Sequence, residues 1–330
     1  MITQPTVLVL GAGASHEYGL PLGPNLKDAI LKALLFAEAG RDQFLFECLQ
    51  NDGIPNPRSL VEAGQFISRH SFPYDSIDEV LHAFSDKPEA VTVGKLAIAS
   101  QIIAAEQKSK LYSRDGLHDF SRTATAAGWL PRFYSLGING VTRKDIASAF
   151  NNVVMINFNY DRCVEFYIYN ATLALGMPHE VAVETVEGLR MIRPYGSLGP
   201  LPWQEKDGSG YGVHVRGSLQ KLAGNLRTFT EALDHEIKSG IGKTIDESIN
   251  MLYLGFGFHP QNFQLLRSSQ FGSHRIFATA FRLHQDNHEQ MKEHFMSALR
   301  KTDGRNIVIR NSTCETMFNE MWPAISFAVG

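Results

Sequence analysis

The feature that most constrains the fold is a short apolar run that ends in a glycine-containing loop. The run TVLVL spans Thr6 to Leu10, and the loop sequence GAGAS follows it at once. Apolar and β-branched residues without a charged side chain are typical of a strand covered on both faces of a parallel sheet. Glycine permits the tight turn by which such a strand leads into a helix. The start of the chain therefore predicts the opening unit of an α/β protein.

A helix is expected after this loop, with Asn25 as its N-cap and Gly40 at its end. Residues 41–150 then read as almost wholly helical, because apolar residues recur at helical spacing in segments that Gly and Pro separate. The clearest segments are FLFECL, SLVEAGQFI, SIDEVLHAF and KLAIASQIIAAEQ. Roughly a hundred residues is far more than an ordinary connection between elements needs. We interpret 41–150 as an all-helical insertion.

Strand-like runs return after the insertion and alternate with helix-like stretches. The runs are VVMINFN, LRMIRP, MLYLGFG, RIFATAF and NIVIR, and the helix-like stretches include NLRTFTEALDHEIKS, HQDNHEQMKEHFMSALRK and TCETMFNEMWPAISF. This alternation predicts an α/β fold with a doubly wound parallel, Rossmann-like sheet. We expect residues 1–40 and 151–330 to form this core. The stretch from Pro200 to Gly217, rich in glycine and proline, is expected to be a mobile loop.

Composition sets the broad class of protein. The chain of 330 residues is 44% hydrophobic, which is enough to bury a large core. Its 31 basic and 34 acidic residues form no cationic stripe, so direct nucleic-acid binding is not expected. Neither a signal peptide nor a run of about 18 apolar residues occurs, so we expect a cytoplasmic protein that does not cross a membrane.

The three cysteines, Cys48, Cys163 and Cys314, stand far apart in the sequence. They offer neither a disulfide framework nor the paired cysteines of a small zinc module. No metal site is predicted, and a reducing compartment suits this pattern best.

The loop after the first strand is a candidate anion site. The N–H groups and the dipole at the start of a helix attract phosphates, and Gly11 and Gly13 permit close backbone approach. The same glycines also fit an ordinary tight turn. The dehydrogenase fingerprint G-x-G-x-x-G needs a third glycine where His16 stands, and an acidic residue after a second strand. The first acidic candidate, Glu38, ends a helix instead, so hydride transfer is the least favoured function.

Four separated motifs occur in a particular order. They are GAGAS with GLP (11–15 and 19–21), NFNYD (157–161), PYGSLG (194–199) and GFGF (255–258). In this combination the sequence resembles the sirtuin family across the predicted sheet-forming core. Within the insertion, SIDEVL (76–81) looks like a motif of bacterial sirtuin-like proteins that degrade NAD in phage defence.

The resemblance implies that the ligand is NAD, bound as a substrate or as a cofactor. The positions that it assigns to binding lie in the first loop, in PYGSLG, and at the ends of two later strands. They are Gly11, Ala12, Gly13, Ala14, Ser15, Gly19, Pro21, Gly196, Ser197, Gly255, Phe256, His259 and Thr279.

The resemblance also implies that Asn159 and Asp161 lie beside nicotinamide and its ribose. From the residues alone, both follow a strand at the edge where α/β sheets bind ligands, although either could instead cap the next helix. Tyr195 stands where the family has a histidine that acts as a general base. An unperturbed tyrosine has a pKa of about 10, so it is a poor base and a better hydrogen-bond partner.

Another histidine could supply the missing base. His16 and His259 lie near the presumed cofactor, and His259 is the foremost candidate, whereas His179 and His214 fall on loops that the sequence does not place. Each of them could equally be an ordinary surface or core histidine.

Two functions remain open at this point. The first is an NAD glycohydrolase, an antiviral defence effector that depletes NAD on activation. The second is a catalytically impaired sirtuin-like module that binds NAD or ADP-ribose within a complex. Protein deacylation is not expected, because the family's deacylases use a paired-cysteine zinc module. The expected partners are further copies of the chain, through the insertion, and a defence protein such as an ATPase or an Argonaute-like protein.

Overall fold

The computed structural model describes residues 2–37, 42–112, 127–232, 234–268, 274–284, 287–300 and 304–326. Its centre is a six-stranded sheet in which every pair of neighbours is parallel. The strands are β1 (Thr6–Leu10), β2 (Val153–Asn157), β3 (Arg190–Ile192), β4 (Asn250–Leu254), β5 (Arg275–Thr279) and β6 (Ile307–Arg310). Their order in the sheet is β3-β2-β1-β4-β5-β6, which is the Rossmann order. The predicted doubly wound parallel sheet is confirmed.

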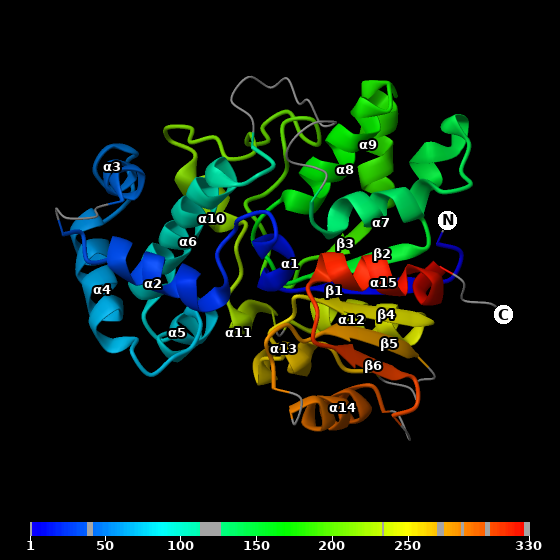
Figure 1. Ribbon diagram of the computed structural model, residues 1–330. Helices are drawn as coiled ribbons and strands as arrows, with labels where there is room; N and C mark the ends of the chain where they lie inside the picture. The colour runs from blue at the N-terminus through cyan, green and yellow to red at the C-terminus, as the bar shows by residue number, and fades with distance from the viewer. Residues whose placement is uncertain are drawn as a thin grey trace.

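Helices cover both faces of this sheet (Figure 1). Val7 and Val9 of β1 belong to the core on one face, and Leu8 and Leu10 belong to the core on the other, as the alternation of a strand requires. The first face is covered by α12 (His235–Asp246), α13 (Pro260–Leu265) and α14 (Asn287–Ala298). The second is covered by α7 (Trp129–Ile138), α8 (Cys163–Ala174) and α15 (Cys314–Ser326).

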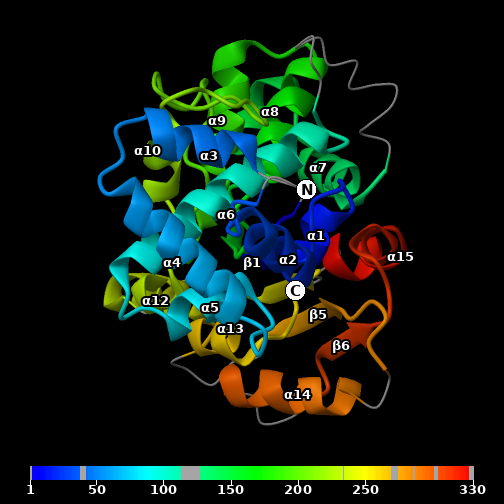
Figure 2. The ribbon, with the colours of Figure 1, turned by 90° about the vertical axis from the view of Figure 1, so that its left-hand side faces the viewer.

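A group of helices lies beside the sheet, at the side of the molecule where β1 has its carboxyl end (Figures 1 and 2). They are α2 (Gly23–Ala33), α3 (Gln43–Asn51), α4 (Pro57–His70), α5 (Ile77–Ala83), α6 (Pro88–Lys108) and α10 (Leu219–Gly224). The long helix α6 lies at their centre and is contacted by the other five. Its buried residues lie all round its circumference, as expected of a helix that is enclosed on every side.

Within 41–150, the described residues 42–112 and 127–150 are largely helical, but their helices lie in two places. Helices α3 to α6 stand at the sheet edge, whereas Trp129 and Phe133 of α7 join Leu8 in the core on one sheet face. Val93 of α6 likewise shares a core with Val7. The insertion and the sheet therefore have common hydrophobic cores, and a division of the chain into separate domains stays a prediction.

Several local predictions need correction. A short helix, α1 (Ala12–His16), follows β1 directly, and α2 begins at Gly23 with Leu22, not Asn25, at its N-cap. Pro24 in its first turn supplies a preset helical φ, so α2 starts without a side-chain cap. Helix α2 ends at Ala33, and Gly40 lies outside the described residues.

The stretch NLRTFTEALDHEIKS forms two helices, where the sequence predicts one. These are α11 (Phe229–Ala232) and α12, and Asp234 separates them because its carboxylate accepts a hydrogen bond from the N–H of Glu236 and so starts a new helix. The remaining elements are α9 (His179–Gly188) and a 3-10 helix over Arg143–Ser148. Among the described residues, no helix is long and apolar enough to cross a membrane.

A buried ion pair fixes the segment from Pro200 to Gly217, which the sequence predicts to be mobile. Arg162, just before α8, lies 2.6 Å from Glu106 of α6, and both side chains are almost fully buried. Arg162 also donates to the carbonyl oxygens of Ser209 and Gly210. Glu106 accepts the N–H of Gly212. The segment is irregular, as expected, but it is anchored to two helices.

Replacing Glu106 by glutamine should destabilise the protein by about 3–5 kcal/mol, because the buried guanidinium of Arg162 then loses its counter-charge. Urea unfolding followed by circular dichroism measures the change. The matched control is Glu62→Gln, which breaks the exposed pair of Glu62 with Arg58 and should leave the midpoint unchanged. Equal midpoints for both variants would contradict the structural role of the buried pair.

Candidate functional site

A cavity of about 790 Å³ opens at the carboxyl ends of β1, β2, β4 and β5. Strands β1 and β4 are neighbours in the sheet. The chain continues from β1 outward through β2 and β3 on one side, and from β4 outward through β5 and β6 on the other. Ligands of α/β proteins bind at this point, where the strand order reverses. The sheet-end loops form its floor, and α2, α5 and α6 border the other side. The lining includes Gly11, Ala12, Gly13, Ser15, His16, Glu17, Pro21, Asp75, Asp78, Ile102, Phe158, Asn159, Tyr160, Asp161, Tyr195, Gly255, Phe256, Gly257, His259, Asn262, Thr279 and Arg282.

Three glycines allow two loops to touch through their backbones at the floor of the cavity. A Cβ on Gly11 would lie 2.6 Å from the carbonyl oxygen of Gly255, and a Cβ on Gly13 would lie 2.7 Å from the Cα of Gly255. The N–H of Gly11 donates to Leu254 O at 3.0 Å, and the N–H of Gly13 donates to Gly255 O at 2.9 Å. These two N–H groups thus hold the loops together and are not directed at a ligand. Close packing explains both glycines.

Gly255→Ala should destabilise the protein by about 2–4 kcal/mol, since Gly255 has a φ of +57° and an added Cβ would lie 2.1 Å from the nitrogen of Ala14. The matched control is Gly257→Ala in the same loop, where an added Cβ meets no atom within 4 Å. Thermal unfolding compares the two variants. A loss of stability in Gly257→Ala as large as that in Gly255→Ala would contradict this account.

Asn159 joins the end of β2 to the loop after β1. Its Nδ2 donates to Gly11 O at 2.9 Å and to Ser15 Oγ at 3.0 Å, and the residue is buried. Asp161 lies two residues on and accepts the N–H of Cys163 at 3.0 Å, at the start of α8. The capping alternative therefore applies to Asp161 and not to Asn159. Both residues line the cavity.

Tyr195 is a buried hydrogen-bond donor in the same cavity. Its hydroxyl donates to Asn262 Oδ1 at 2.7 Å, and its ring packs edge-on against Phe158. Burial, with the nearby carboxylates of Asp78 and Glu79, raises the pKa of Tyr195 well above its usual value. A neutral phenol results, which can position a neighbouring group but cannot take up a proton near neutral pH.

Four of the sequence-predicted binding residues lie outside the cavity lining, namely Ala14, Gly19, Gly196 and Ser197. Gly196, with a φ of +71°, packs on the backbone of Asn225, and Ser197 Oγ accepts a hydrogen bond from its own loop. The other nine line the cavity; among them, Thr279 Oγ1 accepts the N–H of Gly255 at 2.8 Å.

The other candidate histidines are divided in the same way. His16 lines the cavity, and its Nδ1 contacts Leu20 O at 2.8 Å. His179 pairs with Tyr169, and His214 packs against Phe44, so neither reaches the cavity lining.

Helix α5 brings a carboxylate that the sequence does not single out. Ser76 and Glu79 form a capping box at its start, which fixes the first turn of the helix. This places Asp78 against Tyr160, whose hydroxyl donates to Asp78 Oδ1. Burial raises the pKa of Asp78 to about 6 and keeps Tyr160 protonated. The S-x-x-E pattern could have predicted the cap, but not the partner of Asp78.

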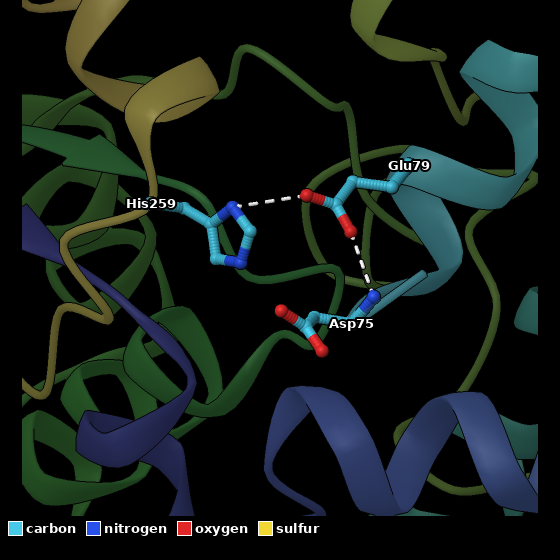
Figure 3. A group of neighbouring side chains, drawn as sticks. All are labelled: Asp75, Glu79 and His259. Carbon is cyan, nitrogen blue, oxygen red and sulfur yellow. Dashed lines mark hydrogen bonds and ion pairs between the residues drawn. The ribbon is translucent and has the colours of Figure 1, made fainter. Parts of the chain in front are cut away.

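Beside Asp78, a histidine is held by a carboxylate at the rim of the cavity. Figure 3 shows His259 Nδ1 directed at Glu79 Oε1, at 3.3 Å, while the other oxygen of Glu79 accepts the N–H of Asp75 at 2.8 Å. The ligand atoms of these three residues lie within 4.8 Å of one another and are of types that bind cations. Glu79 is engaged by the backbone N–H groups of Asp75 and Ser76 and by His259, and together these groups form a hydrogen-bonded cluster.

The cavity lining is acidic. Glu17, Asp75, Asp78 and Asp161 contribute carboxyl groups, whereas Arg282 is the only Lys or Arg among the described lining residues. Burial raises the pKa of Glu17, although its oxygens accept N–H groups at the starts of α7 and α15. Such a lining favours a ligand with a cationic part.

The raised pKa of Asp78 should make stability depend on pH. The folded protein holds this proton up to about pH 6, whereas the unfolded chain releases it near its ordinary pKa of about 3.9, so ionisation favours unfolding between these values. The stability of the wild type relative to Asp78→Asn should fall by roughly 1–3 kcal/mol as the pH rises through this window. Urea titrations at several pH values measure it. A difference that stays constant or grows with pH would contradict the shift.

A scan against protein-family models found no match, and searches of curated proteins and of solved structures found none either. The fold and the cavity are thus the observations on which a function can be based, together with the motif resemblance.

Proposed function

We propose that the chain binds NAD in the cavity at the carboxyl ends of the strands and hydrolyses its nicotinamide–ribose bond. The observation that carries this proposal is the convergence of Asn159, Asp161 and Asp78 in an acidic and aromatic cavity at the Rossmann switch point. The volume of about 790 Å³ falls within the range typical of small-molecule sites. The sirtuin resemblance of the same loops supports the choice of NAD.

The charge of the cavity suits this reaction. Nicotinamide carries a positive charge while it is bonded to the ribose, and the sugar becomes cation-like as the bond breaks. Carboxylates that are fixed in a partly buried site stabilise such a charge without having to reorganise. We assign this role to Asp78 and Asp161, and Tyr160 and Tyr195 form an aromatic wall of the same cavity.

Asn159 is assigned to orient the ribose or the attacking water. Its Nδ2 is committed to Gly11 and Ser15, which fixes the side chain, and Oδ1 forms no hydrogen bond to the described residues. A fixed amide oxygen can accept a hydrogen bond from a hydroxyl or a water. The remaining expectations, namely a cytoplasmic defence role, self-association and an ATPase or Argonaute-like partner, rest on the resemblance and belong to this proposal.

A second candidate is a module that binds NAD or ADP-ribose without cleaving it. It is favoured by the neutral phenol of Tyr195, which occupies the position of the family's catalytic histidine. The two candidates share the cavity and differ only in turnover, so one assay separates them.

Asn159→Ala should lower nicotinamide release from NAD about 100-fold or more, because the amide that orients the ribose or the attacking water in the transition state is lost. The assay is chromatographic detection of nicotinamide, with calorimetric measurement of NAD affinity and thermal unfolding to confirm the fold. The matched control is Asn51→Ala, at the exposed end of α3, which should keep full activity.

The outcomes assign the function. NAD binding without nicotinamide release by the wild type, alone or with the product of its neighbouring gene, favours the binding module. Unchanged release by Asn159→Ala contradicts the assigned role of Asn159. Growth of the absorbance band of reduced nicotinamide, with an alcohol or acid substrate, would indicate a dehydrogenase instead.

A further inference from the structure

The hydrolysis of NAD releases a proton, and the residue that accepts it can be sought among the carboxylates of the cavity. Both oxygens of Glu17 accept N–H groups at helix starts, from Trp129 and Glu315. Asp161 accepts the N–H of Cys163, and Asp75 is exposed. Both oxygens of Glu17 and Oδ1 of Asp161 are thus already engaged by backbone N–H groups at helix starts.

Asp78 differs from the other carboxylates in its partner and in its position. Its hydrogen bond comes from the neutral hydroxyl of Tyr160, a residue between Asn159 and Asp161 in the sequence. The ring of Tyr160 also contacts that of Tyr195, with centroids 6.4 Å apart. Asp78 is therefore hydrogen-bonded to the segment 159–161, whose residues we assign to the nicotinamide–ribose bond. His259 instead contacts Glu79 at the rim of the cavity.

We propose that Asp78, which α5 carries into the cavity, is the general base of the reaction and takes the role that Tyr195 cannot perform. This inference rests on the proposed NAD hydrolysis. The bond between nicotinamide and the ribose carbon breaks, and its electron pair goes to the nicotinamide nitrogen, which becomes neutral. A water oxygen bonds to the ribose carbon, and one of its protons passes to the Asp78 carboxylate and then to solvent.

The surroundings of Asp78 suit this role. The charged and titratable groups nearest to it are Glu79 from its own helix, Tyr160 and Tyr195 from the loops after β2 and β3, and His259 from the loop after β4. Farther off, α11 contributes Glu231, which acts on Tyr160 and is paired with Lys95 of α6. Burial and, to a smaller extent, Glu79 raise the pKa of Asp78, while the hydrogen bonds from Tyr160 and from its own backbone N–H, together with His259, lower it. The balance leaves a carboxylate that can both accept and release a proton near neutral pH.

The test measures nicotinamide release by the full chain between pH 5 and 8, with NAD affinity determined separately by calorimetry. Asp78→Asn should reduce kcat about 100-fold or more while NAD still binds, because the amide keeps the size and the acceptor for Tyr160 but loses the basic site. In the wild type, activity should fall as the pH drops below about 6, and this acid limb should be absent in Asp78→Asn. The charge-matched control is the exposed Asp86→Asn, which should behave as the wild type.

Tyr160→Phe gives an independent readout. The hydrogen bond from Tyr160 lowers the pKa of Asp78, so its removal should move the acid limb to higher pH, while the phenyl ring preserves the packing. A limb that stays in place overturns the coupling of Asp78 to Tyr160 in catalysis.

The remaining outcomes distinguish a failure of the proposed NAD hydrolysis from a failure of the proposed role of Asp78. If wild-type protein releases no nicotinamide, the proposed hydrolysis fails, and the role of Asp78 fails with it. If the wild type is active and Asp78→Asn retains its rate and its acid limb, only the role of Asp78 is overturned. Transfer of the same effects to His259→Gln, with Asp78→Asn unaffected, would assign the base to the histidine held by Glu79.

Discussion

The contact between two backbone loops at the ends of β1 and β4 is the constraint on which the rest of the site depends. Gly11 and Gly13 lie against Gly255 so closely that no side chain fits between them. This contact fixes the first loop, to which Asn159 Nδ2 donates two hydrogen bonds, and it sets the floor of the cavity. Gly11 and Gly13, which the sequence motif assigns to phosphate binding, are thus required first of all for the close approach of one loop to the other.

The helical insertion supplies the side of the cavity that faces the ends of the strands. Helix α5 contributes Asp78 and Glu79, which contact Tyr160 in the loop after β2 and His259 in the loop after β4. Helix α6 is secured by the buried pair of Glu106 with Arg162, close to Asp161 in the sequence. The cavity is lined both by the loops at the carboxyl ends of the strands and by residues of the insertion, so the insertion is part of the site.

The strands were predictable because apolar runs are recorded locally in the sequence, and each of the six lies where such a run occurs. The exact starts of α2 and α12 were not predictable in the same way. Leu22 is an N-cap without a side-chain hydrogen bond, and Asp234 caps α12 only in the backbone conformation that the fold gives it. Of the candidate site, Asn159 and Tyr195 were found by motif position, and the structure brings them to one cavity. The binding residues Gly196 and Ser197 were chosen in the same way, but they face Asn225 and their own loop.

The sequence by itself determined the parallel α/β architecture, the order of its elements and a large helical insertion, because the period of apolar residues specifies strands and helices within short windows. Only the tertiary structure decided that Asp78 meets Tyr160, a residue 82 positions away, and that Glu79 holds His259. Contacts of this kind depend on how whole helices and strands pack against one another. The spacing of residues along the chain does not encode which side chains then face one another.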